Sequence, residues 1–167
     1  MFRQVKDFLN GFDQAVARTQ KVLGALDDET LHKPVVPGNR TLGQIGWHIV
    51  TSIPEMMGRT GLGLTGVDPN SMPPKTAAAV QEGYRKATAE LREAVARNWK
   101  DETLLQVDEL YGEKWVRGVT LGVLIAHETH HVGQMTVLLR LAGRKVPGIM
   151  GPSKEEWTQY GMQAPPY

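Results

Sequence analysis

Residues 120–143 read TLGVLIAHETHHVGQMTVLLRLAG, and this stretch decides the fold that we expect for the chain. Its apolar residues recur at intervals of three and four, which places them on one face of an α-helix. Thr120 is typical of a helix N-cap and Gly143 of the position after a helix, so we predict a helix over 121–142. A single amphipathic helix needs partners to cover its apolar face. The face consists of Leu121, Leu124, Ile125, Val132, Met135, Leu138 and Leu139.

Three other segments show the same helical spacing. Apolar residues line one face of 2–26 and of 42–59, and we expect the second of these helices to begin with a capping box of Thr41 and Gln44. Residues 76–99 are rich in Ala, Glu, Lys and Arg, which are strong helix formers. Gly and Pro separate the segments, so we predict distinct helices.

The connections complete the expected architecture. Residues 60–75 are dense in Gly and Pro, which predicts a long crossover between the second and third helices. Residues 101–119 lack a helical period, and they predict a small hairpin around Tyr111 and Gly112. We therefore predict a single all-α domain over 1–167, a four-helix bundle of the kind in which cofactor sites lie between facing helices.

The C-terminal tail carries one more helix signal. In GPSKEEWTQYGMQAPPY, residues 151–167, Ser153 and Glu156 have the spacing of a capping box. We expect them to open a short C-terminal helix.

The composition excludes several functions. The chain has 167 residues, of which 41% are hydrophobic and 22% charged, which is typical of one globular domain. Its formal net charge of +1 is too small to attract nucleic acid or an anionic membrane surface. The absence of cysteine excludes a thiolate nucleophile of the protein's own, a cysteine-ligated zinc site and an iron–sulfur cluster. The sequence shows neither a signal peptide nor an apolar run that could span a bilayer, so we expect a cytoplasmic protein without nucleic-acid or membrane partners.

Four of the five histidines fall on predicted helices, which is an uneven distribution. His127 and His131 lie one turn apart and about 40° around the helix, on its apolar face, so we expect both imidazoles to point into the bundle. His48 lies on the core side of the second helix and is the candidate for a third imidazole directed at the same place. We expect His130 on the solvent side, and His32 lies in a loop and receives no functional assignment.

Histidines in these three positions form a candidate metal site. Burial favours neutral imidazoles, which are the form that binds a metal. Three of them leave coordination positions open, so a bound ion lowers the pKa of a water ligand toward about 7 or binds a thiol as the thiolate. A divalent Zn or Ni ion is the first expectation, and Fe and Mn also fit these donors.

The run HETHH, residues 127–131, also satisfies the zincin motif H-E-x-x-H, in which the glutamate is the general base of a metalloprotease. The metzincin extension requires glycine and histidine at two later positions, where this chain has Gln134 and Val137. A gluzincin requires a third-ligand glutamate on a later helix, whereas Glu155 and Glu156 follow a Gly/Pro break. Zincins also carry a sheet beside this helix, and no series of strands precedes it here. The sequence therefore disfavours proteolysis.

The chain resembles the DinB/YfiT-like family of helical-bundle metalloenzymes, which is unrelated to the similarly named DNA polymerase. The resemblance rests on Trp47-His48 within LGQIGWHIVTS, on the H-x-x-x-H of the fourth helix followed by x-G-Q, and on the long crossover. It implies that the family's three metal-binding histidines fall on His48, His127 and His131. Many members carry arginine between the last histidine and Gly-Gln, where this chain has Val132.

Characterised members of this family are thiol-dependent transferases or isomerases. The resemblance therefore implies a divalent-metal-dependent enzyme that activates a low-molecular-weight thiol to attack an electrophilic substrate. The absence of cysteine fits this function, because the nucleophile then arrives with the cosubstrate. One alternative is a metal-dependent hydrolase in which Glu128 or Gln134 handles the water, and these two residues are the catalytic candidates. Another is a non-catalytic metal-binding stress protein, and homodimerisation through a bundle face is compatible with each of these.

Overall fold

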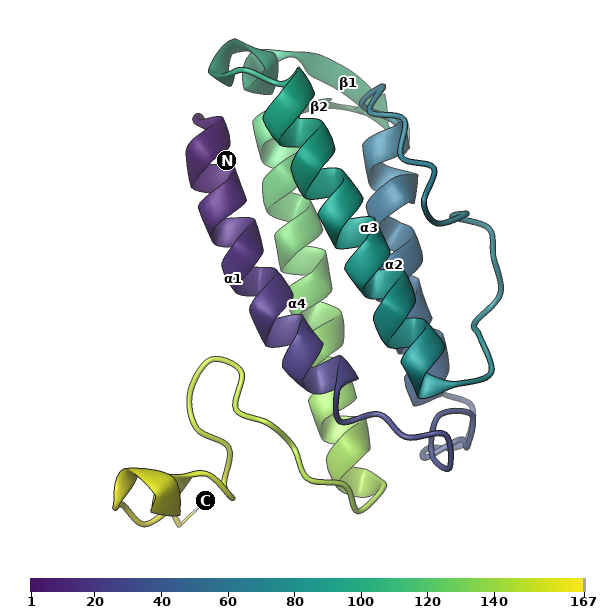
Figure 1. Ribbon diagram of the computed structural model, residues 1–167, viewed down its shortest axis with the longest axis vertical. Coiled ribbons are helices and arrows are strands. Elements are labelled where there is room, and N and C mark those ends of the chain that lie inside the picture. Colours follow the sequence, from purple (N-terminus) through teal and green to yellow (C-terminus); the bar gives the residue numbers. More distant parts are fainter. Residues whose placement is uncertain (167) are drawn as a thin grey trace.

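Four long helices form a bundle in the computed structural model, which describes residues 1–166 (Figure 1). A two-stranded antiparallel hairpin closes one end of the bundle, and the C-terminal segment leaves the other end. The predicted four-helix bundle is confirmed, together with the long crossover between its second and third helices. The elements are α1 (Val5–Leu23), α2 (Leu42–Gly58), α3 (Ala77–Asn98), η1 (Asp101–Leu105), β1 (Val107–Leu110), β2 (Glu113–Val116), α4 (Arg117–Leu141) and η2 (Trp157–Tyr160).

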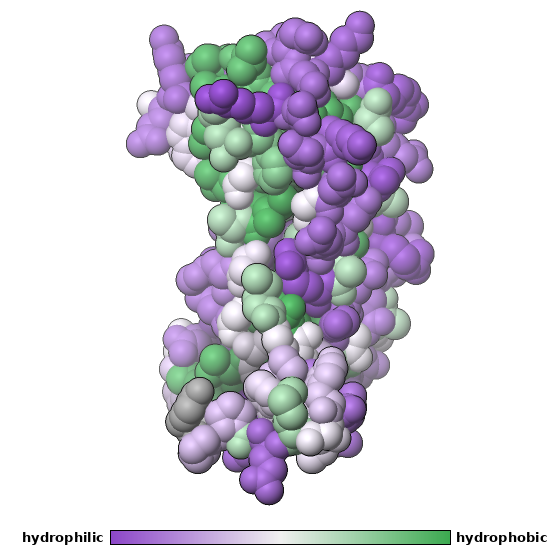
Figure 2. Space-filling model, turned by 90° about the vertical axis from the view of Figure 1, so that its left-hand side faces the viewer, coloured by the Kyte–Doolittle hydropathy of each residue, from purple (hydrophilic) through white to green (hydrophobic). Residues whose placement is uncertain are grey.

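Each helix packs against two others, because α1 and α2 both contact α3 and α4. Their apolar faces meet in one core, and on α4 the expected face is buried except for Ile125, which is half-buried. Seen from the side of α1, polar residues cover most of the surface and apolar residues gather in a band that is broadest near the hairpin end (Figure 2). Across the described residues, we find no helix with both the length and the apolar character that a bilayer span requires.

The start of α4 differs from the prediction. The helix begins at Arg117, and its N-cap is Val116. Thr120 lies inside the helix, where its hydroxyl donates to the carbonyl of Val116 at 3.5 Å, so the predicted cap was wrong. β2 leads directly into α4, and the backbone N–H of Arg117 donates to the carbonyl of Gln106 at 2.9 Å. Pairing with a distant backbone segment thus takes the place of a side-chain cap.

Two other local predictions are confirmed. Thr41 Oγ1 accepts from the backbone N–H of Gln44 at 3.2 Å, and Gln44 Oε1 accepts from that of Thr41 at 2.8 Å, which completes the capping box of α2. Tyr111 and Gly112 form the hairpin turn with φ angles of 54° and 82°. Both angles lie in the left-handed region that a two-residue type I′ turn requires.

Both ends of the chain form shorter helices than we predicted. α1 spans Val5–Leu23, whereas we predicted a helix over 2–26. At its start, the N–H of Phe2 pairs with the carbonyl of Gly118 at 2.9 Å and draws the first residues away from the helix. Near the C-terminus, Glu156 accepts from the N–H of Ser153 at 3.0 Å, but the Ser153 hydroxyl has no partner among the described residues. The helix that follows is the single 3-10 turn η2.

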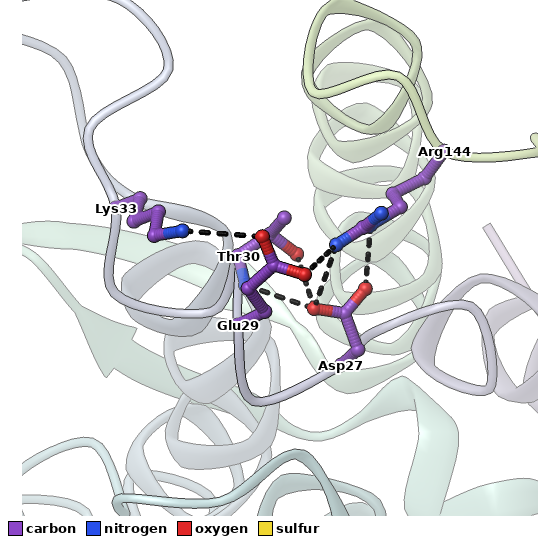
Figure 3. Close-up of polar contacts among 5 residues, drawn as sticks. All are labelled: Asp27, Glu29, Thr30, Lys33 and Arg144. Carbon is purple, nitrogen blue, oxygen red and sulfur yellow. Dashed lines mark hydrogen bonds and ion pairs between the residues drawn. The ribbon is translucent and has the colours of Figure 1, made fainter.

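An ion-pair network joins the loop after α1 to the segment after α4 (Figure 3). Arg144 Nε lies 2.6 Å from an oxygen of Asp27, and Arg144 Nη2 lies 2.8 Å from an oxygen of Glu29. Asp27 also accepts from the backbone N–H and the hydroxyl of Thr30, at 2.8 and 3.0 Å. Lys33 adds a contact of 3.3 Å to Glu29. The network holds the beginning of the α1–α2 connection against the end of α4.

Candidate metal centre

Three histidines from two helices converge between α2 and α4. His48 comes from α2, and His127 and His131 lie one turn apart on α4. The Nε2 atom of His127 lies 3.3 Å from that of His48 and 3.1 Å from that of His131. One ring nitrogen of each residue lies within 4.8 Å of the others. The structure therefore brings together the three residues that the sequence singled out.

The two Nε2 separations at His127 fit nitrogens that share one metal ion. Two nitrogens bound to the same ion at about 2.0–2.1 Å lie about 3.3–3.4 Å apart at a tetrahedral angle and about 2.8–3.0 Å apart at a right angle. The two observed separations, 3.1 and 3.3 Å, fall within this span. A set of imidazole donors suits Zn, Ni, Fe and Mn, so the donors alone do not select the metal.

Hydrogen bonds between the three rings cannot account for both short contacts of His127. The side-chain oxygen of Gln134 accepts from Nδ1 of His131 at 2.8 Å, so Nε2 of His131 carries a lone pair. His127 approaches both other histidines through its single Nε2 atom, which carries either a proton or a lone pair. In either tautomer, one of the two contacts lacks a hydrogen bond. A cation shared by three lone pairs removes this conflict, and this is the strongest structural argument for a metal site.

Burial keeps the imidazoles neutral. Desolvation lowers the pKa of His48 to about 4, and the neighbouring imidazoles and the positive charge of Arg40 act in the same direction. Desolvation also lowers the pKa of His127 and that of His131. The negative charge of Glu55 opposes the shift at His48 and His127 without reversing it. At neutral pH the three rings can therefore bind a metal without first losing a proton.

Glu128, one of the two catalytic candidates, makes its contacts on a different side of α4. Its carboxylate is buried, and Oε1 accepts hydrogen bonds from the hydroxyls of Thr19 on α1 and Tyr84 on α3, the latter at 2.5 Å. Oε2 has no partner within residues 1–166, and burial raises the pKa of the Glu128 carboxyl group. The structure thus engages this carboxylate with core hydroxyls, whereas the histidines gather against α2.

Gln134, the other candidate, is a neighbour of the histidines. Its hydrogen bond to Nδ1 fixes the tautomer and the ring orientation of His131, which is the usual role of a residue behind a metal ligand. His130 is exposed, and its ring centroid lies 5.0 Å from that of His131. Val132, at the position where many DinB/YfiT-like proteins carry arginine, is buried in the core and offers no charge to the site.

The aromatic residues of the region fix the surrounding segments. Trp47 precedes His48, and its Nε1 donates to the carbonyl of Ser71 at 2.9 Å, which ties the crossover to α2. At the hairpin, the hydroxyl of Tyr111 donates to Glu55 at 2.6 Å, and the ring of Trp115 lies edge-on to that of Tyr111. These contacts hold the hairpin against the end of α2.

A cavity of about 470 Å³ opens beside His131. Gln134 lines it next to the histidine, and Asn39 and Arg40 contribute from the connection that precedes α2. The remaining lining residues are aliphatic, namely Val36, Ile45, Val137, Leu138 and Leu141. Sequence reasoning missed Arg40, because it lies in an irregular loop where no periodicity indicates the direction of a side chain.

A four-helix bundle in which histidines from two facing helices converge defines a class of protein, the helical bundles with a candidate metal site in the core. The sequence profile of the DinB family matches residues 1–164. The chain belongs to the DinB family, and the resemblance noted from its motifs is confirmed.

Similar proteins cover nearly the whole chain. The uncharacterized protein YrdA of Bacillus subtilis (strain 168) is 38% identical over 165 residues, which are 99% of this chain and 99% of YrdA. The crystal structure of a DinB-like protein from Bacillus cereus ATCC 10987 shares 38% identity, with a TM-score of 0.85 over 89% of this chain and 99% of that one. YfiT from Bacillus subtilis, described as a probable metal-dependent hydrolase with an unusual four-helix bundle topology, shares 17% identity and a TM-score of 0.66. That alignment covers 87% of this chain and 91% of YfiT, and at this identity it supports the fold alone.

Proposed function

We propose that this protein is a divalent-metal-dependent enzyme with His48, His127 and His131 as its ligands, and that it transfers a low-molecular-weight thiol to an electrophile. One observation carries the proposal, namely that three imidazoles converge with two Nε2 separations that fit an ion and that hydrogen bonds between the rings cannot both explain. Bound there, a divalent ion would supply Lewis-acid chemistry that lowers the pKa of a thiol or water ligand.

The chain's own residues favour an anionic nucleophile. Three neutral imidazoles leave the charge of a divalent ion uncompensated, so an anion is a better further ligand than a neutral group. The Gln134 amide holds His131 in the tautomer that offers Nε2. Since His48 comes from α2 and the other two ligands from α4, the site also depends on the packing of these two helices.

The two predicted catalytic candidates, Glu128 and Gln134, do not supply a general base for water. A general base that assists a nucleophile must lie within hydrogen-bond reach of the proton that it removes. The Glu128 carboxylate is bonded to core hydroxyls, and the Gln134 amide is not basic. A thiol has a pKa of about 8.5 in water, so its proton can pass to solvent. Its sulfur then forms a bond to the electrophilic carbon while the bond to the leaving group breaks.

Metal-dependent hydrolysis is the second candidate. YfiT, which shares the fold, is described as a probable metal-dependent hydrolase. In this chain, the exposed His130 lies beside His131 and is a group that could accept a proton from water. Hydrolysis of an ester without added thiol, and its loss on replacement of His130, would favour this function.

The test begins with untagged protein, because a histidine tag would itself bind metal. We expect elemental analysis to find about one divalent ion per chain, and His127→Ala to lose it, whereas His130→Ala retains it. The loaded protein is then mixed with cysteine and monobromobimane, and separately with p-nitrophenyl acetate. We expect the wild type and His130→Ala to accelerate only the thiol reaction. Equal rates for wild type and His127→Ala in both assays would overturn the proposal.

A further inference from the structure

The cavity beside His131 contains a guanidinium group without a counter-charge. The solvent-exposed Arg40 lines this cavity, and no ion pair within residues 1–166 involves its side chain. Asp and Glu are absent from the lining, whose other polar members are Asn39, His131 and Gln134. Six other arginines pair with carboxylates, whereas Arg3, Arg18 and Arg97, like Arg40, form no ion pair within the described residues.

The rest of the lining indicates an aliphatic ligand. Its apolar side chains are all Val, Ile or Leu, and they come from both sides of the cavity, with Ile45 on α2 and Leu138 on α4 among them. The volume of about 470 Å³ lies within the range of small-molecule sites. A short alkyl chain would remove apolar surface from water here, while a negative group at one end would meet Arg40.

Arg40 and one of the three histidines, His131, line the same cavity. His131 lines the cavity itself, and the positive charge of Arg40 contributes to the lowered pKa of each of the three histidines. A ligand that fills the cavity therefore lies beside both Arg40 and His131.

We propose that Arg40 and the aliphatic wall of this cavity form a subsite for an alkyl carboxylate, so that the substrate carries a carboxylate on a short aliphatic stem. The planar fork of the guanidinium matches the planar, singly charged carboxylate. One guanidinium balances the single charge of a carboxylate, whereas a phosphate dianion carries two charges. This inference rests on the proposed function, because it assigns Arg40 as a specificity-determining residue of the same site.

The experiment measures binding by calorimetry with three probes that share one alkyl chain: hexanoate, hexanamide and hexyl phosphate. Each is titrated into metal-loaded protein and into chelator-treated protein, because a carboxylate can also bind a metal directly. The variants are Arg40→Gln, Arg40→Lys and, as the matched control, Arg97→Gln on the exposed face of α3. Metal content is determined for every sample.

We expect hexanoate to bind the wild type at least tenfold more tightly than hexanamide, with or without metal. Arg40→Gln should remove this preference and leave hexanamide binding unchanged, whereas Arg40→Lys should retain part of it and Arg97→Gln all of it. Lengthening the acid from butanoate to hexanoate should tighten binding, by up to about fourfold per methylene. Equal binding of hexanoate and hexanamide to metal-free protein, or tighter binding of hexyl phosphate, would overturn the inference. Failure to bind metal would overturn the proposed function instead, and the metal-free titrations would still decide on Arg40.

Discussion

Replacing Tyr84 with phenylalanine removes one hydroxyl from the centre of the bundle and leaves the ring in place. Tyr84 is fully buried, and its hydroxyl donates to Glu128 Oε1 at 2.5 Å. A hydrogen bond to a charged group contributes about 1.5–3 kcal/mol. In the variant, the hydroxyl of Thr19 remains as the donor to Oε1, and Oε2 is already without a partner in the described structure. We therefore expect the free energy of unfolding to fall by about 1.5–3 kcal/mol.

Urea denaturation measures this loss. The slope of the free energy of unfolding against urea concentration should stay unchanged, because the surface exposed on unfolding is the same. Tyr111→Phe is the matched control. Its hydroxyl also donates to a glutamate, Glu55, at 2.6 Å, but the side chain is exposed. We expect the control to change stability by less than about 0.5 kcal/mol.

Metal content separates a core role of Glu128 from a role in the metal site. Since Tyr84 binds Glu128 on the α1/α3 side, we expect Tyr84→Phe to keep the wild-type metal affinity. A variant of unchanged stability and weakened metal binding would refute this reasoning, because it would place the Glu128 carboxylate in the site. In a Glu128→Gln background, the cost of Tyr84→Phe should fall toward about 0.5–1.5 kcal/mol, the value for a bond between neutral groups.

Three further predictions concern packing, pH and metal. Gly83→Ala should destabilise the protein by about 1–3 kcal/mol in urea denaturation, since its Cβ would lie 2.5 Å from the ring of Trp47. As the control, Gly133→Ala should stabilise the protein by about 0.8–1 kcal/mol, because no atom lies within 4 Å of the added Cβ. Desolvation alone would raise the pKa of Asp27, but hydrogen bonds from Thr30 and ion pairing with Arg144 outweigh it and lower that pKa from 3.8. The folded state therefore binds this proton less readily than the unfolded state, so the charged Asp27 stabilises the fold at neutral pH, and this stabilisation is lost on acidification below about pH 4. Asp27→Asn should therefore lower the free energy of unfolding by up to about 1 kcal/mol above about pH 4 and have no effect below it. With the free metal concentration held at 100 times its Kd, adding a chelator should lower the free energy of unfolding by about 2.7 kcal/mol and the melting temperature by about 5–11 °C. An unchanged melting temperature would contradict metal binding.

The sequence determines the helices of this fold more completely than their ends. The apolar face of α4 was predictable because its buried positions repeat with the helical period. The start of α4 was not, because Arg117 finds its backbone partner in Gln106, on the far side of the hairpin. A capping signal such as Thr120 reports only local preference, and a tertiary contact overrode it.

The same distinction applies to the candidate site. His127 and His131 could be paired from their spacing, and His48 from its place on the core side of its own helix. The partners of Glu128 could not be foreseen, because they depend on which helices flank α4 and at what height. Arg40 was likewise hidden, since the path of its loop depends on tertiary contacts and not on a period.

The packing of α4 also explains why the glutamate of the H-E-x-x-H motif does not lie beside the histidines, as it does in a metalloprotease. Consecutive residues lie about 100° apart around a helix, so His127 faces α2 while Glu128 meets α1 and α3. Turning Glu128 toward the histidines would require α4 to rotate by that angle. The rotation would expose much of the apolar face that includes Leu124 and Leu138, at a cost on the order of 10 kcal/mol, which is comparable to the whole stability of a domain. The fold therefore argues against Glu128 as a general base for a nucleophile held at the three histidines.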